Sequence, residues 1–152
     1  MNLDRLKEIR EDKDISQSKM ADILGISRTY YANCENGIKI ITLDKLNIFI
    51  NYFNVSFDYI LMKTNKRNYS DYAKIDFIDY KYLGSNIKKY REVNNLSQLD
   101  LAGKINTSQV AISKYESGHI KISTNNLCKM AQIFKISIDE LIRPKIDKVY
   151  SK

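Results

Sequence analysis

The chain has 152 residues, of which 28% are charged and 43% hydrophobic, a composition typical of a folded globular protein and not of a disordered or membrane-spanning one. Its formal net charge of +7 favours a polyanionic partner. With only two cysteines and one histidine, we expect neither a disulfide framework nor a metal site, and the cysteines fit a reducing cytoplasm.

Five short helices are predicted in the first 62 residues. Leu3, Leu6 and Ile9 recur at helical spacing and indicate the first of them. The other four are expected to begin at hydroxyl-bearing N-caps, namely Ser16, Ser27, Thr42 and Ser56. Gly25 permits a left-handed turn between the second and third helices. We therefore expect residues 1–62 to form a small all-helical domain.

The joining segment, residues 63–82, reads KTNKRNYSDYAKIDFIDYKY. Its first half is polar and typical of a linker. Its second half holds large apolar side chains: Tyr72, Ile75, Phe77, Ile78, Tyr80 and Tyr82. So much apolar surface argues against a loose tether. We expect the segment to extend or pack on the domain that follows it, with an inter-domain or dimer contact as the alternative.

The second half of the chain repeats the first. A shift of 81 residues aligns Leu6–Leu61 with Ile87–Ile142 without a gap, and 14 of the 56 pairs are identical. The repeated N-caps are Ser97, Ser108, Ser123 and Ser137. Asn106 replaces Gly25 and is a residue that also tolerates the left-handed backbone. The repeat predicts two domains of one fold, residues 1–62 and 83–143, joined by the linker 63–82 and followed by a basic tail, 144–152.

The spacing inside each repeat favours a helix-turn-helix arrangement. Ala21 and Ala102 lie in the second helix of their halves, where a small side chain lets the third helix cross closely. Tyr31 and Ile112 are expected to fill that crossing from the third helix, and Cys34 is expected in the core. A plain helical hairpin would not need a small residue, a turn residue and a large residue at the same spacing twice.

At these residues the sequence resembles the helix-turn-helix family of phage repressors, Cro proteins and xenobiotic-response-element regulators. The matching motifs are ISQSKMADILGISRTYYANCENG and LSQLDLAGKINTSQVAISKYESG, and the resemblance covers about 120 of the 152 residues. It implies an all-α protein made of two tandem five-helix, lambda-repressor-like helix-turn-helix domains. It also implies that the third helix of each domain enters the major groove of DNA.

The resemblance assigns roles to particular residues. It implies base contacts from the third helices by Arg28, Thr29, Tyr30 and Asn33 in the first domain and by Gln109, Val110 and Lys114 in the second. It implies that Gln17 and Gln98, which open the second helices, hold DNA phosphates. It also implies two structural pairs, Arg10–Glu35 and Arg91–Glu116.

Side-chain chemistry supports these assignments. Arg28 can bind guanine O6 and N7 with two hydrogen bonds, Gln109 can do the same to adenine N6 and N7, and Val110 offers an apolar surface to a thymine methyl group. Basic residues follow both third helices, where they can meet phosphate: Lys39, His119 and Lys121.

We therefore expect a cytoplasmic, nucleoid-associated repressor that binds double-stranded operator DNA, with a homodimer left open. Residues 1–62 carry a net charge of −1 and residues 83–143 a net charge of +4, so one alternative is that only the second domain binds DNA and the first binds protein or dimerises. An antitoxin or a restriction controller is another alternative. No catalytic constellation, cofactor motif, small-molecule site or membrane span is recognisable, so an enzyme is not expected.

Overall fold

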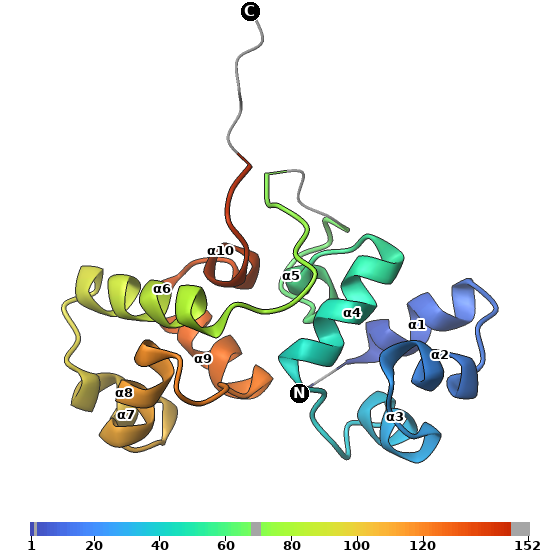
Figure 1. Cartoon of the computed structure of the whole chain (residues 1–152), viewed down its shortest axis with the longest axis horizontal. Coiled ribbons are helices and arrows are strands. Elements are labelled where there is room, and N and C mark those ends of the chain that lie inside the picture. Colours follow the sequence, from blue (N-terminus) through green and yellow to red (C-terminus); the bar gives the residue numbers. More distant parts are fainter. Residues whose placement is uncertain (2, 68–70, 147–152) are drawn as a thin grey trace, which may run out of the picture. The chain divides into compact units, whose positions relative to one another are not determined.

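The computed structural model describes residues 1, 3–67 and 71–146, and within them it forms ten helices and one isolated β-bridge (Figure 1). The contacts divide the chain into two compact units. Unit 1 consists of Met1–Phe77 together with the segment that begins at Arg143, and unit 2 consists of Ile78–Ile142. None of the described helices is long and apolar enough to span a bilayer. The expectation of an all-α fold is confirmed.

Unit 1 contains the five predicted helices. They are α1 (Asp4–Asp12), α2 (Gln17–Leu24), α3 (Arg28–Glu35), α4 (Leu43–Phe53) and α5 (Phe57–Ile60). Each predicted cap accepts a hydrogen bond from the backbone amide three residues later: Ser16, Ser27, Thr42 and Ser56. Gly25 has a φ of 67°, in the left-handed region. In Figure 1, α2 and α3 lie side by side in blue, as their packing requires.

Unit 2 repeats the arrangement. Its helices are α6 (Tyr80–Val93), α7 (Gln98–Ile105), α8 (Gln109–Ser117), α9 (Thr124–Phe134) and α10 (Ile138–Ile142). The predicted caps again accept amide hydrogen bonds at their N-termini: Ser97, Ser108, Ser123 and Ser137. Asn106 has a φ of 58° and ends α7 as Gly25 ends α2. The two predicted helical repeats are therefore confirmed as two helical units.

The crossing of the second and third helices is packed as its sequence indicates. Ala21 and Tyr31 are fully buried in unit 1, and Ala102 and Ile112 are fully buried in unit 2. Cys34 lies in the core of unit 1, as expected, and is a free thiol. A methyl side chain on α2 and α7 lets α3 and α8 approach closely, which holds the third helix of each unit at a fixed crossing.

The two units differ in their first helix. In the repeat, Asp4 aligns with Ser85, so α6, which begins at Tyr80, starts five residues earlier than α1. The carboxylate of Asp79 caps α6 by accepting the amides of Lys81 and Tyr82. The expected boundary at residue 83 therefore falls inside α6. Unit 2 carries an additional N-terminal turn that α1 does not have.

The joining segment packs differently from the expectation. Only Ile78–Tyr82 belong to unit 2, whereas residues 63–77 belong to unit 1. The amides of Asn47 and Asn51 on α4 both donate to the carbonyl of Ile75, at 3.1 and 2.7 Å. The Arg5 guanidinium donates to the carbonyl of Thr64 at 2.5 Å. Because unit 1 satisfies these carbonyls, most of the segment is a docked part of that unit.

The chain returns to unit 1 after completing unit 2. The amide of Ala73 donates to the carbonyl of Pro144, and the amide of Ile146 donates to the carbonyl of Asp71, both at 2.8 Å. The guanidinium of Arg143 lies 6.0 Å from the ring centres of Phe57 and Tyr72. The expected basic tail, residues 144–152, is therefore docked on unit 1 as far as residue 146, and residues 147–152 lie outside the described residues.

Candidate nucleic-acid interface

A buried ion pair joins the first and third helices of unit 1. Nε of Arg10 donates to Oε1 of Glu35 at 2.6 Å and Nη2 donates to Oε2 at 3.1 Å. The amide nitrogen of Gln17, at the start of α2, donates to the same Oε2 at 3.0 Å. Arg10 also donates to the carbonyl of Ile15 at 2.7 Å, in the turn before α2. One carboxylate at the end of α3 thus ties three helices together.

Unit 2 builds the same network with the same atoms. Arg91 binds both carboxylate oxygens of Glu116, at 2.5 and 3.3 Å, and donates to the carbonyl of Leu96 at 2.7 Å. The amide of Gln98 donates to Glu116 Oε2 at 2.9 Å. The structure brings both expected arginine–glutamate pairs together. It also adds a glutamine to each pair, a contact that the sequence assignments missed.

The position of the two glutamines leaves them able to bind a further group. Gln17 and Gln98 are the first residues of α2 and α7, and both are half-buried. A primary amide has two N–H donors and a carbonyl acceptor, and the bond to the glutamate uses one donor. The glutamate fixes the orientation of each amide, and one N–H remains for a ligand such as a phosphate oxygen.

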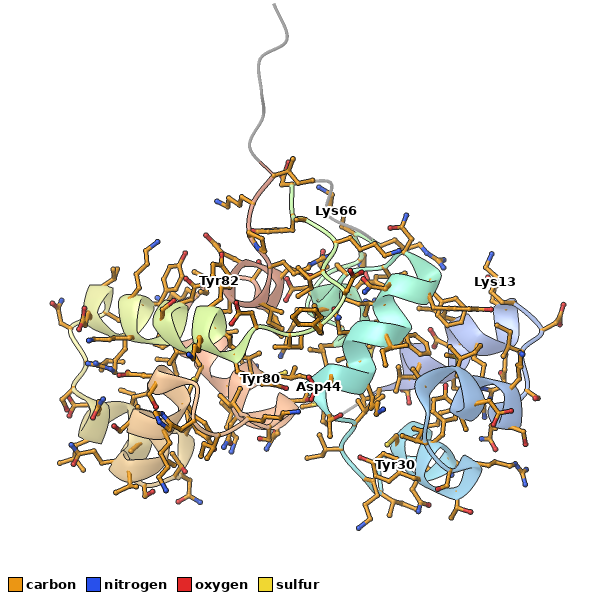
Figure 2. The ribbon with its side chains drawn as sticks, in the orientation of Figure 1. Lys13, Tyr30, Asp44, Lys66, Tyr80 and Tyr82 are labelled. Atoms are coloured by element: carbon orange, nitrogen blue, oxygen red, sulfur yellow. The ribbon has the colours of Figure 1, made fainter. Side chains whose placement is uncertain are left out.

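The start of α3 presents polar side chains. Arg28 and Thr29 are exposed and Asn33 is half-exposed. Tyr30 differs, because it is half-buried and its hydroxyl donates to the carbonyl of Ile40 at 3.1 Å, in the loop after α3 (Figure 2). While this bond is made, the Tyr30 hydroxyl can still accept a hydrogen bond from a base amino group but cannot donate one to a base acceptor.

The start of α8 is more open. Gln109, Val110 and Lys114 are all exposed, and Val110 exposes 62% of its surface. Ser113 is also exposed. It follows Gln109 by four residues, so it lies on the same face of the helix. The sequence assignments did not include Ser113.

The other expected phosphate-contact residues lie in the loops after α3 and α8. Lys39, His119 and Lys121 are exposed. Nδ1 of His119 lies 2.6 Å from the hydroxyl of Ser117, and the ammonium of Lys121 lies 5.4 Å from the ring centre of Tyr80. Within the described residues no group of three or more His, Cys, Asp or Glu side chains could hold a metal ion.

The network in unit 1 perturbs the ionisation of its carboxylate. Burial acts to raise the pKa of Glu35, but the hydrogen bonds from Arg10 and Gln17 and the charge of Arg10 outweigh it and hold the pKa of Glu35 below its ordinary value. The same pairing raises the pKa of Arg10. The folded state of unit 1 therefore favours the charged forms of both partners.

A pH titration should reveal this stabilisation. A carboxylate whose pKa is lower in the folded state stabilises the fold above its unfolded pKa of about 4.3 and loses that effect as the pH falls through the folded pKa. We expect the difference in unfolding free energy between the natural chain and Glu35→Gln to be constant above about pH 6 and to shrink between about pH 5 and pH 3. Urea titrations followed by the NMR signals of α1–α3 at each pH would measure it, and a difference that grows at low pH would contradict the assignment.

Comparison with known proteins gives one family match in each half of the chain. A family model described as "Helix-turn-helix" matches residues 6–60 and 87–141, which together make up more than half of the chain. The chain is 36% identical over 67 residues to the HTH-type transcriptional regulator AnsR of Bacillus subtilis (strain 168), covering 44% of this chain and 58% of AnsR. It is 32% identical over 60 residues to the antitoxin PezA of Streptococcus pneumoniae serotype 4, covering 40% of this chain and 38% of PezA. The chain thus spans less than two thirds of the length of either relative.

Solved structures match a similar share of the chain. The restriction-modification controller protein C.AhdI from Aeromonas hydrophila aligns with a TM-score of 0.40 and 27% identity, covering 41% of this chain and 96% of that protein. The P22 c2 repressor, in a crystal structure with a synthetic operator, aligns with a TM-score of 0.38 and 27% identity, covering 39% of this chain and 89% of that protein.

Proposed function

The chain belongs to the helix-turn-helix family of the XRE and lambda-repressor type, with one such domain in each half, and from this membership we propose that it is a sequence-specific regulator of transcription that binds double-stranded operator DNA, acting as a repressor. The observation that carries the proposal is the glutamine–glutamate–arginine network, which recurs with the same atoms in both units. It holds the glutamine at the start of the second helix next to the C-terminal end of the third helix. We assign the protein to the cytoplasm, at the nucleoid.

In the proposed complex the third helix of each unit enters the major groove. Arg28 in α3 and Gln109 in α8 are exposed at the first position of their helices, where either side chain can form two hydrogen bonds to a base edge. Thr29, Asn33, Val110 and Lys114 complete the two contact surfaces. A good pair of base contacts contributes roughly 1–3 kcal/mol of discrimination against the wrong base.

Phosphate contacts would fix the register of each unit on the duplex. We assign this role to the amides of Gln17 and Gln98, whose orientation is set by the bound glutamates. Lys39, His119 and Lys121 would hold the backbone from the loops that follow α3 and α8. Such contacts supply affinity and orientation but carry no sequence information directly.

Two units in one chain would give the protein two different contact surfaces. Arg28 and Thr29 in α3 align with Gln109 and Val110 in α8, so the two units present different chemistry to the groove. Linking them makes the second binding event intramolecular and raises the apparent affinity. We therefore propose an operator with two half-sites of different sequence.

Selection of binding sites from random duplexes tests the proposal, and Gln109→Ala sharpens it. The natural chain should select a site of two unlike half-sites. Gln109→Ala should lose preference at one or two base pairs of one half-site, by roughly five- to a hundredfold at that position, while its binding to random DNA stays the same. Comparing the two selected-site profiles measures this loss.

The exposed Gln132 on α9 offers a matched control. Gln132→Ala removes the same side chain outside α8 and should reproduce the natural profile. Failure of the natural chain to enrich any site would reject the proposed function. An unchanged profile for Gln109→Ala would reject base contact by that residue.

Two observations favour a second candidate function, in which only unit 2 binds DNA and unit 1 binds protein or dimerises. The Tyr30 hydroxyl is bound to the loop after α3, and residues 1–62 carry a net charge of −1. A selected site with a single half-site that is lost in Gln109→Ala and unaffected by Arg28→Ala would support it. The similarity to PezA favours a third role, as an antitoxin, which co-expression with the product of the adjacent gene would test.

A further inference from the structure

The additional first turn of α6 packs against the end of the proposed recognition helix α8. Gly84 lies so close that a Cβ atom there would be 2.3 Å from the carbonyl oxygen of Tyr115 and 2.5 Å from that of Glu116. A Cβ on Gly118, the residue that ends α8, would lie 3.0 Å from Cγ of Lys81 and 3.1 Å from its backbone nitrogen. The crossing thus fixes Lys81 beside the point where the chain leaves α8.

Basic side chains gather at this point. Lys81, His119 and Lys121 are all exposed. The ammonium of Lys121 lies over the ring of Tyr80, the first residue of α6, which is labelled in Figure 2. Lys81 comes from the first turn of α6, whereas the other two come from the loop after α8. The elements packed here thus bring cations from two distant parts of the sequence to one surface.

The acidic groups near this surface have partners. The carboxylate of Asp79 accepts the amides of Lys81 and Tyr82, so it also occupies the first amides of α6. The carboxylate of Glu116 is bound by Arg91 and Gln98. An anion at this surface would therefore be held by the cationic side chains and not by the end of the helix.

We propose that Lys81 binds a phosphate of the DNA backbone, next to the phosphates held by His119 and Lys121. The inference rests on the proposed function, in which the loop after α8 borders the major groove. A lysine fixed against Gly118 lies at the same border and adds one positive charge to it. Lys81 is thus a phosphate-binding residue contributed by α6, outside the helix-turn-helix motif itself.

In unit 1 the glycine that aligns with Gly118 is Gly37, and a Cβ there would lie 3.9 Å from the backbone carbonyl oxygen of Met1 and near no lysine side chain among the described residues. The helix α1 begins at Asp4, which aligns with Ser85, so the turn that carries Lys81 in α6 is missing from α1. No lysine or arginine of α1 therefore occupies the position of Lys81, so this cation distinguishes unit 2 from unit 1. This difference has the same sign as the difference in net charge, −1 for residues 1–62 and +4 for residues 83–143.

The salt dependence of DNA binding by the full chain tests the proposal. Lys81→Gln keeps the Cγ atom that lies beside Gly118 and removes the positive charge. On a duplex selected by the natural chain, we expect its slope of log K against log salt to be shallower by about 0.9, the value for one phosphate contact. Its affinity should fall roughly five- to tenfold at 0.1 M salt, by the same factor on selected and random duplexes. Lys81→Arg should keep the natural slope.

Lys88→Gln provides the matched control. Lys88 is exposed on the same helix, and the substitution makes the same change in net charge about 10 Å further along the helix axis. It should leave the slope unchanged. A natural slope in Lys81→Gln, or an equal loss of slope in Lys88→Gln, would overturn the inference while leaving the proposed function intact. Absence of binding by the natural chain to any selected duplex would reject the proposed function, and the inference with it. Thermal unfolding would verify that both variants are folded.

Discussion

Replacing Glu35 with leucine is expected to lower the free energy of unfolding of unit 1 by about 3–5 kcal/mol, the usual cost of removing one partner of a buried ion pair. The Glu35 side chain is 1% exposed and that of Arg10 is 7% exposed. The substitution leaves the buried guanidinium with only the exposed carboxylate of Glu11, 3.6 Å away, as a counter-charge. It also removes the acceptor of the Gln17 amide. Amide hydrogen exchange along the chain would measure the loss as reduced protection of α1–α3, with unit 2 unchanged.

Two further variants separate the buried pair from an ordinary surface charge. Glu8 is exposed on the same helix, α1, so Glu8→Leu should cost less than about 1 kcal/mol. In the double variant Arg10→Met with Glu35→Leu no charge is left unpaired, and it should cost less than the sum of the two single variants. A cost below about 1 kcal/mol for Glu35→Leu alone would mean that the pair does not brace unit 1.

Replacing Gly84 with alanine is expected to destabilise unit 2 by about 3 kcal/mol, at the upper end of the usual cost of overpacking. The new Cβ would lie 2.3 Å from the carbonyl oxygen of Tyr115. That atom belongs to the backbone of α8, so no side chain can rotate away to make room. Either α6 moves from α8 or α8 bends. Urea unfolding followed by the NMR signals of unit 2 would measure the effect.

Gly103 supplies the control for this substitution, because it also lies inside a helix of unit 2. A Cβ there meets nothing within 4 Å. Gly103→Ala should therefore stabilise the unit by up to about 1 kcal/mol, through the better helix propensity of alanine. The same change of residue is thus expected to have opposite signs in α6 and α7. Equal effects at the two positions would show that the close crossing of α6 and α8 does not exist in solution.

Local chemistry is the reason that the sequence predicts most of the helices. Ser16 and Ser108 act as caps through bonds to amides only three residues away, and Asn106 takes the left-handed conformation by itself. Signals of this kind lie in a few consecutive residues and repeat in both halves. They are sufficient for the order of the helices and for the burial of Tyr31 and Ile112 at the crossings.

Long-range contacts explain what the sequence could not predict. The second domain was expected to begin at residue 83, whereas α6 begins at Tyr80 and holds Gly84 in its interior, where the backbone of Tyr115 crosses closely. The docking of residues 63–77 depends on bonds from Asn47 and Asn51 to Ile75, which follow no period in the sequence. Both features become visible only when distant segments are packed together.

The sequence named the residues of the candidate site but did not predict most of their hydrogen-bond partners. The family resemblance paired Arg10 with Glu35 and gave Gln17 a phosphate, but it did not predict that Gln17 binds that same carboxylate. It also treated Tyr30 like Arg28, although only the structure shows the hydroxyl held by Ile40. Positions on a helix surface follow from spacing, whereas the partners of long polar side chains depend on which loops fold over them.

The return of the chain to unit 1 determines the order in which the two units can complete their folding during synthesis on the ribosome. The amide of Ala73 needs the carbonyl of Pro144, and the carbonyl of Asp71 needs the amide of Ile146. At about 5–20 residues per second, every residue of unit 2 has left the peptidyl-transferase centre before these partners are made. The nascent chain can therefore assemble the five helices of unit 1 first but must wait for unit 2 before it closes that unit. The first domain to begin folding is the last to be completed.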